Sequence, residues 1–316
     1  MTVVACVQAE PAILDCEATL DRLEQLTTEA AGNGAQLVVF PETFVAVYPS
    51  SRWAKSFAGW QNEGAKATFA RIAENSVAVG SPAERRLAAC ARELGVWLVT
   101  GVNEVEAERP GTIYNALLYH SPDGELALHH RKLVPTNHER LIWGRGDGRG
   151  LHAVETGFGR LGGLICWENY MPLARAALYE SGVELYVAST ADDSDAWQAT
   201  LVHIARESRA YVIAPCVFQR ASSYPEDFPL ASELEGAGVL GRGGSAIVAP
   251  DGSYLAGPLY DEEGILYAEV DRSRLLAERQ RFDPVGHYSR PDVLELTVRG
   301  DDATTSTRPS ARSSRP

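Results

Sequence analysis

Residues 162–172 have the sequence GGLICWENYMP, which marks a passage from a buried strand to a helix. The apolar run at 161–165 has the length of a core strand, and Pro172 suits the first position of a helix. Cys166 lies between the two segments. Because a helix N-terminus carries unpaired N–H groups and a positive dipole end, this position would favour a thiolate over a thiol. The stretch therefore predicts an α/β protein with a thiol at the end of a core strand.

Strand-like and helix-like segments alternate on both sides of this stretch. Strands are predicted at 3–7, 37–40, 96–100, 184–188, 211–217 and 265–270. Helices are predicted at 20–31, 82–94, 172–180 and 196–210, of which the second has a capping serine at 81 and a proline directly after it. Turn residues at 121–124 and 251–252 predict hairpins at 113–132 and 243–258. The pattern is typical of a mixed α/β fold.

Composition and charge limit the classes of partner. The chain has 316 residues, of which 45% are hydrophobic, and a formal net charge of -13. With no sustained Lys/Arg cluster, this balance argues against nucleic acid or an anionic membrane and favours a small-molecule substrate. Residues 1–300 are expected to form a single domain. Residues 301–316 are rich in Ser, Thr, Arg and Pro and are expected to be a disordered tail.

The cysteines and the lack of long apolar segments indicate in which cellular compartment the protein resides. No stretch approaches the roughly 20 apolar residues of a membrane span, and the apolar segment at 3–7 is too short for a signal peptide. The chain has five scattered cysteines, an odd number without metal-ligand or redox spacing. These features predict a cytoplasmic protein with reduced thiols, which needs no metal and no cofactor.

Two charged residues accompany Cys166 at the ends of predicted strands. Glu42 follows the apolar run 37–41, and Lys132 ends the second arm of the first hairpin. Open α/β sheets place ligand sites at such strand ends. Taken singly, a cysteine in an apolar strand is more often inert core, a glutamate after Phe-Pro is equally a cap, and a strand-end lysine is usually solvated.

Taken together, these residues resemble the Glu-Lys-Cys triad of the nitrilase superfamily. The motifs are FPE at 40–42, HRKLVP at 130–135 and ICWE at 165–168, and the resemblance extends from about residue 3 to 295. Glu139 matches the second glutamate of the family. Trp167 and Glu168 resemble the nitrilase branch proper, since amidase and carbamoylase relatives often have Asp at the second of these positions. The stretches 143–151 and 197–205 resemble nitrilases as well.

The resemblance implies a fold, an assembly and a reaction with named residues in its steps. The implied fold is a four-layer αββα sandwich, two β-sheets face to face with helices outside. Family members commonly dimerise through the helices after the nucleophile strand, here 172–182 and 196–209, and nitrilases often extend into spiral homo-oligomers. Cys166 would attack the nitrile carbon, and Glu42 would act as general acid and base. Lys132 and the backbone N–H of Trp167 would stabilise the intermediates, with Glu139 in support.

The identity of the substrate is less constrained. Six aromatic residues near the motifs either line a pocket, which would favour aromatic or arylaliphatic nitriles, or belong to the core; they are Tyr48, Trp53, Trp143, Trp167, Tyr170 and Trp197. A related thiol amidase, carbamoylase or cyanide-degrading enzyme is the alternative function. A third reading is an inactive scaffold that works through protein contacts.

Other motifs are weaker. The glycine-rich stretch 144–150 follows no strand and lacks a phosphate-binding ending, so a surface or active-site loop is expected there. His129, His130 and His138 lack the companions of a metal site. A Cys-His protease built on Cys166 with His138 or His203 lacks a papain-type sequence around the nucleophile.

Overall fold

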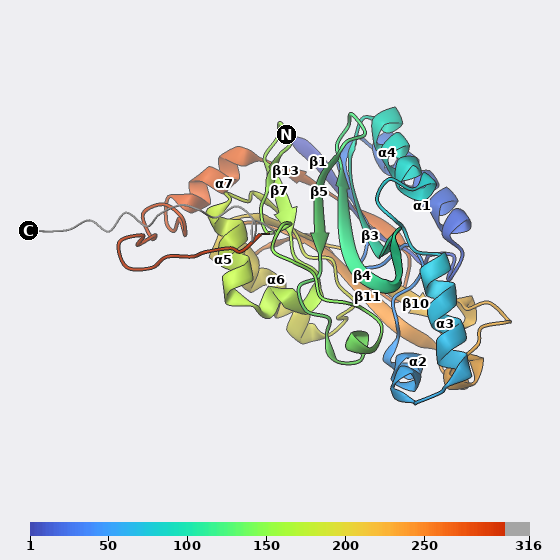
Figure 1. The fold of residues 1–316 in the computed structure, drawn as a ribbon. Helices are drawn as coiled ribbons and strands as arrows, with labels where there is room; N and C mark the ends of the chain where they lie inside the picture. The colour runs from blue at the N-terminus through green and yellow to red at the C-terminus, as the bar shows by residue number, and fades with distance from the viewer. Residues whose placement is uncertain (301–316) are drawn as a thin grey trace, which may run out of the picture.

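The computed structural model describes residues 1–300, so the tail predicted at 301–316 lies outside the described residues. Figure 1 shows two β-sheets in the middle of the molecule with helices on both outer sides. The first sheet has six strands in the order β13-β1-β2-β3-β4-β5, and the second has seven, β10-β11-β9-β8-β7-β6 with β12 beside β11.

The strands of the first sheet are β1 Thr2–Gln8, β2 Ala35–Val39, β3 Trp97–Glu106, β4 Arg109–His120, β5 Leu126–Arg131 and β13 Gly264–Val270. Those of the second are β6 Val154–Glu155, β7 Arg160–Gly163, β8 Leu185–Val187, β9 Tyr211–Ala214, β10 Phe218–Arg220, β11 Val239–Val248 and β12 Tyr254–Tyr260. Strands β1, β2 and β3 run parallel to one another, as do β7, β8 and β9. The two sheets are therefore mixed.

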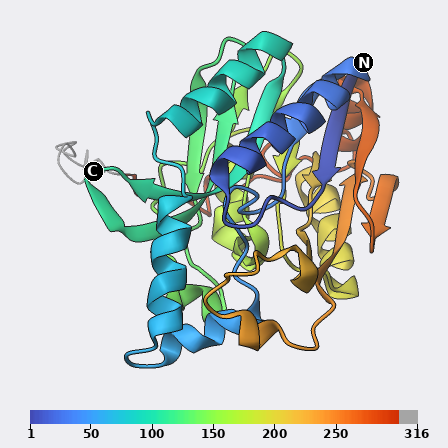
Figure 2. The same ribbon diagram turned by 90° about the vertical axis from the view of Figure 1, so that its right-hand side faces the viewer.

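The helices are α1 Cys16–Gly32, α2 Ser51–Ala54, α3 Glu63–Glu74, α4 Pro82–Leu94, α5 Pro172–Glu180, α6 Asp195–Ser208 and α7 Arg272–Arg279. The short 3-10 turns are η1 Lys55–Ala58, η2 Asn137–Leu141, η3 Cys166–Tyr170, η4 Ala221–Ser223 and η5 Ala231–Leu234. In Figure 2 α1 and α4 lie across the outer face of the first sheet. Helices α5 and α6 cover the second sheet from the opposite side.

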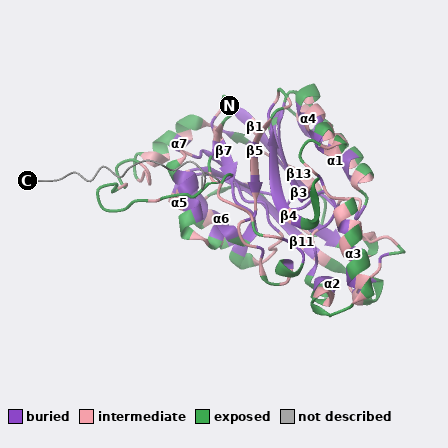
Figure 3. Cartoon of the chain, in the orientation of Figure 1, coloured by how far each residue is buried: buried purple, intermediate pink, exposed green. Residues whose placement is uncertain are grey.

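Buried side chains fill three successive interfaces between these layers. One cluster joins the two sheets, with Val39 of β2 and Val187 of β8 both fully buried in it. A second packs α1 and α4 on the first sheet, and a third packs α5 and α6 on the second. Figure 3 shows the buried strands between helices whose outer faces are exposed. The αββα sandwich implied by the resemblance is confirmed.

Local signals decided most of the elements that were predicted correctly. The Ser81 side chain accepts a hydrogen bond from the Glu84 N–H, and Gly95 ends α4 in the left-handed conformation. Both hairpins are present as β4/β5 and β11/β12. Several elements differ from expectation: α1 begins at Cys16, β4 at Arg109 and β11 at Val239. In addition, β3 continues to Glu106, β7 ends at Gly163, and β9 ends at Ala214. Helices α2, α3 and α7 and the short strands β6 and β10 were not predicted.

Candidate active site

The structure brings the predicted residues of three strand ends together in one buried cluster. A carboxylate oxygen of Glu42, one of Glu139 and the Cys166 sulfur all lie within 4.8 Å of one another. Glu42 lies just beyond β2, whereas Lys132 directly follows β5 and Cys166 lies beyond β7. All four side chains are buried. The cluster therefore lies where the ends of both sheets meet.

Lys132 is the centre of the cluster. Its Nζ donates one hydrogen bond to Glu42 Oε1 and another to Glu139 Oε2, each at 2.7 Å. The ammonium also lies 5.7 Å from the centroid of the Trp143 ring. Burial alone lowers the pKa of Lys132, but the neighbouring carboxylates raise it more, so the net pKa lies above its ordinary value. The side chain therefore carries a positive charge at neutral pH.

Glu42 has one bound and one available oxygen. Its Oε1 accepts hydrogen bonds from Lys132 Nζ and, at 2.7 Å, from Asn115 Nδ2. Its Oε2 is buried and has no hydrogen-bond partner among the described residues. Burial raises the pKa of the Glu42 carboxyl to about 7, although the Lys132 ammonium opposes the shift. A carboxyl of this kind can both accept and return a proton near neutral pH.

The turn that carries Glu42 lies directly against β3. A Cβ placed on Gly101 would lie 2.0 Å from the Pro41 carbonyl oxygen and 2.9 Å from the Glu42 Cα. Only glycine allows the two backbones to approach so closely. The backbone of β3 thus defines the position of the Glu42 turn.

Cys166 adopts a left-handed backbone conformation, with φ of 52°, as the first residue of the 3-10 turn η3. Its N–H donates to the Ser189 carbonyl at 2.8 Å, and the Thr190 hydroxyl lies 3.2 Å from Sγ, to which it donates. Helix α5 begins only at Pro172. A non-glycine residue in this region is strained and has to be held by its surroundings.

The prediction that the helix N-terminus favours a thiolate at Cys166 is wrong. Burial raises the pKa of the thiol, the Glu42 carboxylate raises it further, and the Lys132 ammonium offsets only part of the effect. The resting group is therefore a neutral thiol. A nucleophilic role would require a base next to it, and Glu42 lies within reach.

Glu139 has partners on both carboxylate oxygens. Tyr48 donates its hydroxyl to Oε1 at 2.8 Å, and the Thr136 N–H donates to Oε2 at 2.6 Å, where Lys132 is also bound. Neither carboxylate oxygen of Glu139 is therefore left free to take part in proton transfer. The geometry is that of a group that orients the lysine.

The predicted glycine-rich loop covers the backbone that leads to Lys132. The Gly146 N–H donates to the Lys132 carbonyl at 2.8 Å. A Cβ on Gly146 would lie 2.2 Å from the Arg131 carbonyl oxygen, and one on Gly150 would lie 2.6 Å from the His130 Cα. The glycines let the loop lie flat on β5, so the loop supports the site and does not form a phosphate cradle.

The six aromatic residues divide between site and core. Tyr48 and Trp143 are next to Glu139 and Lys132, whereas Trp53 and Trp197 are fully buried core residues. Trp167 is 49% exposed, and its indole N–H donates to Asp192 Oδ2 at 2.8 Å. Tyr170 is 45% exposed and lies edge-on to Trp167, with ring centroids 5.6 Å apart. These last two form an exposed aromatic pair on η3, the turn that begins at Cys166.

Asn115 is the site residue that the sequence analysis missed. It lies on β4, where its carbonyl accepts from the Lys132 N–H at 2.8 Å and its side chain donates to Glu42. A fully buried asparagine within the apolar strand segment 113–119 needs a polar partner. That mismatch with its neighbours was the available signal.

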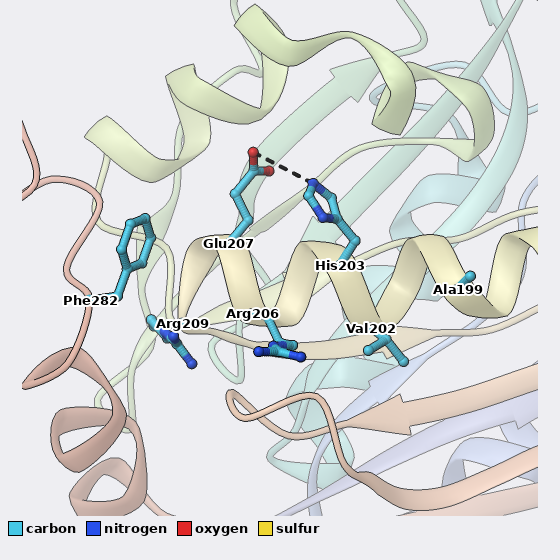
Figure 4. A pocket seen from close by; sticks show the side chains of 7 residues that line it. All are labelled: Ala199, Val202, His203, Arg206, Glu207, Arg209 and Phe282. Carbon is cyan, nitrogen blue, oxygen red and sulfur yellow. Dashed lines mark ion pairs between the residues drawn. The ribbon is translucent and has the colours of Figure 1, made fainter.

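Two cavities lie at different distances from the cluster. A small one of about 10 Å³ is lined by Glu42, Thr43, Tyr48 and mostly apolar neighbours. This volume suffices for about one water molecule, not for an aromatic ring. A surface cavity of about 500 Å³ lies along α6, and Figure 4 shows His203 and Glu207 paired at its edge. None of the predicted site residues lines the surface cavity.

The acidic and thiol ligand atoms of the cluster are of the kind that bind divalent cations. Lys132 Nζ, however, lies 2.7 Å from each of the two carboxylates. A second cation among the same atoms would be repelled by the ammonium. His129, His130 and His138 bond separately to Glu104, Glu168 and the Pro49 carbonyl. The donor set thus fits a lysine better than a metal.

The site contains a buried thiol beside a carboxyl and an ammonium group, where the ends of the two sheets meet. A thiol hydrolase uses this set of groups, a nucleophile with a base and a cation next to it. The family model described as carbon-nitrogen hydrolase matches residues 3–280. The chain belongs to the carbon-nitrogen hydrolase family.

Individual relatives agree with this assignment. An aliphatic nitrilase of Sinorhizobium fredii is 44% identical, with 93% of this chain and 94% of that protein covered. An arylacetonitrilase of Trametes versicolor is 40% identical, with 95% and 97% covered. A solved carbon-nitrogen hydrolase from Helicobacter pylori shares the fold, with a TM-score of 0.70 at 22% identity over 92% of this chain and 96% of that one.

Proposed function

We propose that this protein is a nitrilase that hydrolyses an organic nitrile to the carboxylic acid and ammonia. The observation that carries the proposal is the Glu42 carboxylate next to the neutral Cys166 thiol. Lys132 and Asn115 hold Oε1 of this carboxylate, and Oε2 has no hydrogen-bond partner among the described residues. The names of the two curated relatives at 40% and 44% identity support the same activity.

The first half of the reaction forms a covalent adduct. The Cys166 sulfur bonds to the nitrile carbon while its proton moves through Glu42 to the nitrile nitrogen, giving a thioimidate. Water activated by Glu42 then adds to the thioimidate carbon, the carbon-nitrogen bond breaks, and ammonia leaves. A thioester remains on Cys166.

The second half consumes another water. Glu42 takes a proton from this water, the thioester carbon is attacked, and the carboxylic acid leaves as the thiol is restored. Lys132 and the Trp167 backbone N–H are the proposed donors to the tetrahedral intermediates, each worth about 3 to 4 kcal/mol in comparable sites. That N–H has no acceptor among the described residues. Glu139 holds Lys132 in place.

Activity should depend on pH through Glu42. Burial raises the pKa of this carboxyl from 4.5 to about 7. Below that pH the carboxyl holds a proton and cannot take one from Cys166. We therefore expect kcat/KM to rise with pH through about 7, measured as initial rates of ammonia release. An acid limb near 4.5 instead would argue against Glu42 as the base.

The preferred substrates are proposed to be aromatic or arylaliphatic nitriles. The exposed pair of Trp167 and Tyr170 lies on the same turn, η3, as Cys166 and offers an aromatic surface there. Both an aliphatic nitrilase and an arylacetonitrilase are among the relatives, so the test must include both classes.

The deciding assay compares ammonia release from benzonitrile, phenylacetonitrile, an aliphatic dinitrile, cyanide and the corresponding amides. Turnover of the nitriles above that of the amides is the expected result. Faster turnover of the amides would make the protein an amidase, and turnover of cyanide alone would make it a cyanide-degrading enzyme.

A homo-oligomer built on the helices after the nucleophile is part of the proposal. Leu173 on α5 is 72% exposed, and the surface cavity along α6 lies on the same outer layer. We expect a dimer or larger spiral assembly by light scattering, and Leu173→Arg should shift it toward smaller species. A wild-type monomer of 34.2 kDa would contradict this.

The cytoplasm is the proposed location. All five cysteines are free thiols, which suits a reducing compartment. No helix within residues 1–300 combines the length and apolar character needed to cross a bilayer.

A further inference from the structure

We infer that Glu168 is a positioning residue that sets the spacing between Lys132 and Cys166. The inference deepens the nitrilase function proposed above and rests on it. Glu168 is 1% exposed, and it lies on η3 two residues after the nucleophile. None of the proposed chemical steps uses its carboxylate.

The carboxylate of Glu168 binds the backbone on both sides of the site. Its Oε1 accepts from the Leu133 N–H at 2.6 Å, and its Oε2 accepts from the Ile165 N–H at 2.8 Å. Leu133 directly follows Lys132, and Ile165 directly precedes Cys166. A single side chain thus joins the neighbours of the ammonium and the thiol.

This connection spans the two sheets. Strand β5, which leads to Lys132, is paired with β4 in the first sheet, whereas β7, which leads to Cys166, is paired with β6 and β8 in the second. Because β5 and β7 share no ladder, ordinary strand pairing cannot set the distance between their ends. The Glu168 carboxylate does so directly.

The strained conformation of Cys166 increases the importance of this contact. With φ at 52°, Cys166 needs fixed groups on both sides of its peptide unit. Glu168 holds the Ile165 N–H before it, and the Asn169 side chain donates to the Cys166 carbonyl at 2.8 Å after it. Loss of the first contact would free the turn to relax and move the thiol.

The role requires a carboxylate and not merely a side chain of this size. An ionised carboxylate only accepts hydrogen bonds, whereas glutamine presents an NH₂ group on one side. In Glu168→Gln that group would face either the Leu133 N–H or the Ile165 N–H, donor against donor. His130, whose Nε2 lies 3.0 Å from Oε2, supports the carboxylate from the third side.

The chain contains a matched control for this substitution. Glu84 on α4 also bonds a buried histidine, His120, at 2.7 Å and accepts from a backbone N–H, that of Gly80, at 3.2 Å. It contacts none of the site residues in the described structure. Glu84→Gln therefore removes an equivalent buried Glu-His contact without touching Lys132 or Cys166.

The experiment compares wild type, E168Q and E84Q in the full chain. Melting temperature, kcat and KM for the best nitrile are measured, together with the pH dependence of Cys166 alkylation by iodoacetamide, located by peptide mass spectrometry. Because misplacement by about 1 Å can cost roughly 100-fold in rate, we expect kcat of E168Q to fall by about that factor with little change in KM. Its alkylation profile should also shift. E84Q should lose stability and keep both kcat and the profile.

Each outcome decides the inference. The inference would be overturned if E168Q kept the wild-type kcat and an unchanged pH profile of alkylation. It would also be overturned if E84Q lost as much kcat as E168Q while the two variants had the same melting temperature. If E168Q does not fold, E168D, which keeps the charge with a shorter reach, is measured in the same way and should lie between wild type and that loss. If wild type releases no ammonia from any nitrile, the proposed function fails, whereas the alkylation comparison still tests Glu168.

Discussion

Replacement of Cys166 by alanine is expected to abolish the release of both acid and ammonia from every nitrile. The methyl group cannot form the thioimidate or the thioester, and no other nucleophile of the cluster can replace the sulfur, since Lys132 is held as a charged ammonium. Ammonia and acid are measured over long incubations at high enzyme concentration. The fold should be retained, because the change removes only one small buried atom.

Cys90→Ala provides the matched control. Cys90 is also buried, at 6% exposure, but it lies on α4, in the core between the helices and the first sheet, and not in the site. This variant should turn over nitriles at the wild-type rate. Turnover by Cys166→Ala, with purified protein and no contaminating activity, would rule out the thiol mechanism.

Glu42→Gln is expected to lose almost all turnover as well. Glutamine has nearly the same shape and can still accept a hydrogen bond from Lys132, but it cannot take the proton of Cys166 or of water. Loss of a general acid-base group costs typically 10² to 10⁴-fold, and we expect roughly that or more, since Glu42 acts in each proposed step. Initial rates and mass spectrometry of the protein are the measurements, and neither thioimidate nor thioester should accumulate.

Glu184→Gln is the control that distinguishes the loss of the Glu42 carboxylate from the loss of any buried carboxylate. Glu184 is 5% exposed and bonds Arg272 at 3.2 Å, at the opposite end of β8 from the candidate site. It should retain activity while losing some stability. An active Glu42→Gln protein would require another base, and an accumulating thioester would limit Glu42 to the second half of the reaction.

Local sequence signals determined the elements that were predicted correctly. The cap at Ser81, the proline at the start of α5 and the turn residues at 121–124 act within a few residues of chain. By contrast, α3 buries only Ala65, Thr68 and Ile72, and α7 buries only Leu275, so neither helix has a strong apolar stripe. The caps Asn62 and Asp271 were local signals for these two helices that the sequence analysis did not use.

The candidate site shows the same difference between what local sequence signals predict and what contacts between distant residues decide. Glu42, Lys132 and Cys166 were chosen because each charged or nucleophilic group ends a predicted strand, and their meeting within one cluster agrees with that choice. The partners of these groups were not predictable in the same way. Asn115 and Glu168 act through contacts with residues 73 and 35 positions away, respectively. Such pairs exist only after the two sheets have packed.

The sequence by itself determined the α/β alternation and, through its motifs, the carbon-nitrogen hydrolase family, and it singled out Glu42, Lys132, Glu139 and Cys166 as candidates. Only the tertiary structure decided the protonation states. From the sequence, Cys166 was expected to be a thiolate at a helix N-terminus, but in the fold it is a neutral thiol on a strained turn, and Glu42 is the group that titrates near 7. The reason is burial: removal of water disfavours charge more strongly than a nearby helix dipole favours it, and burial exists only in the packed molecule.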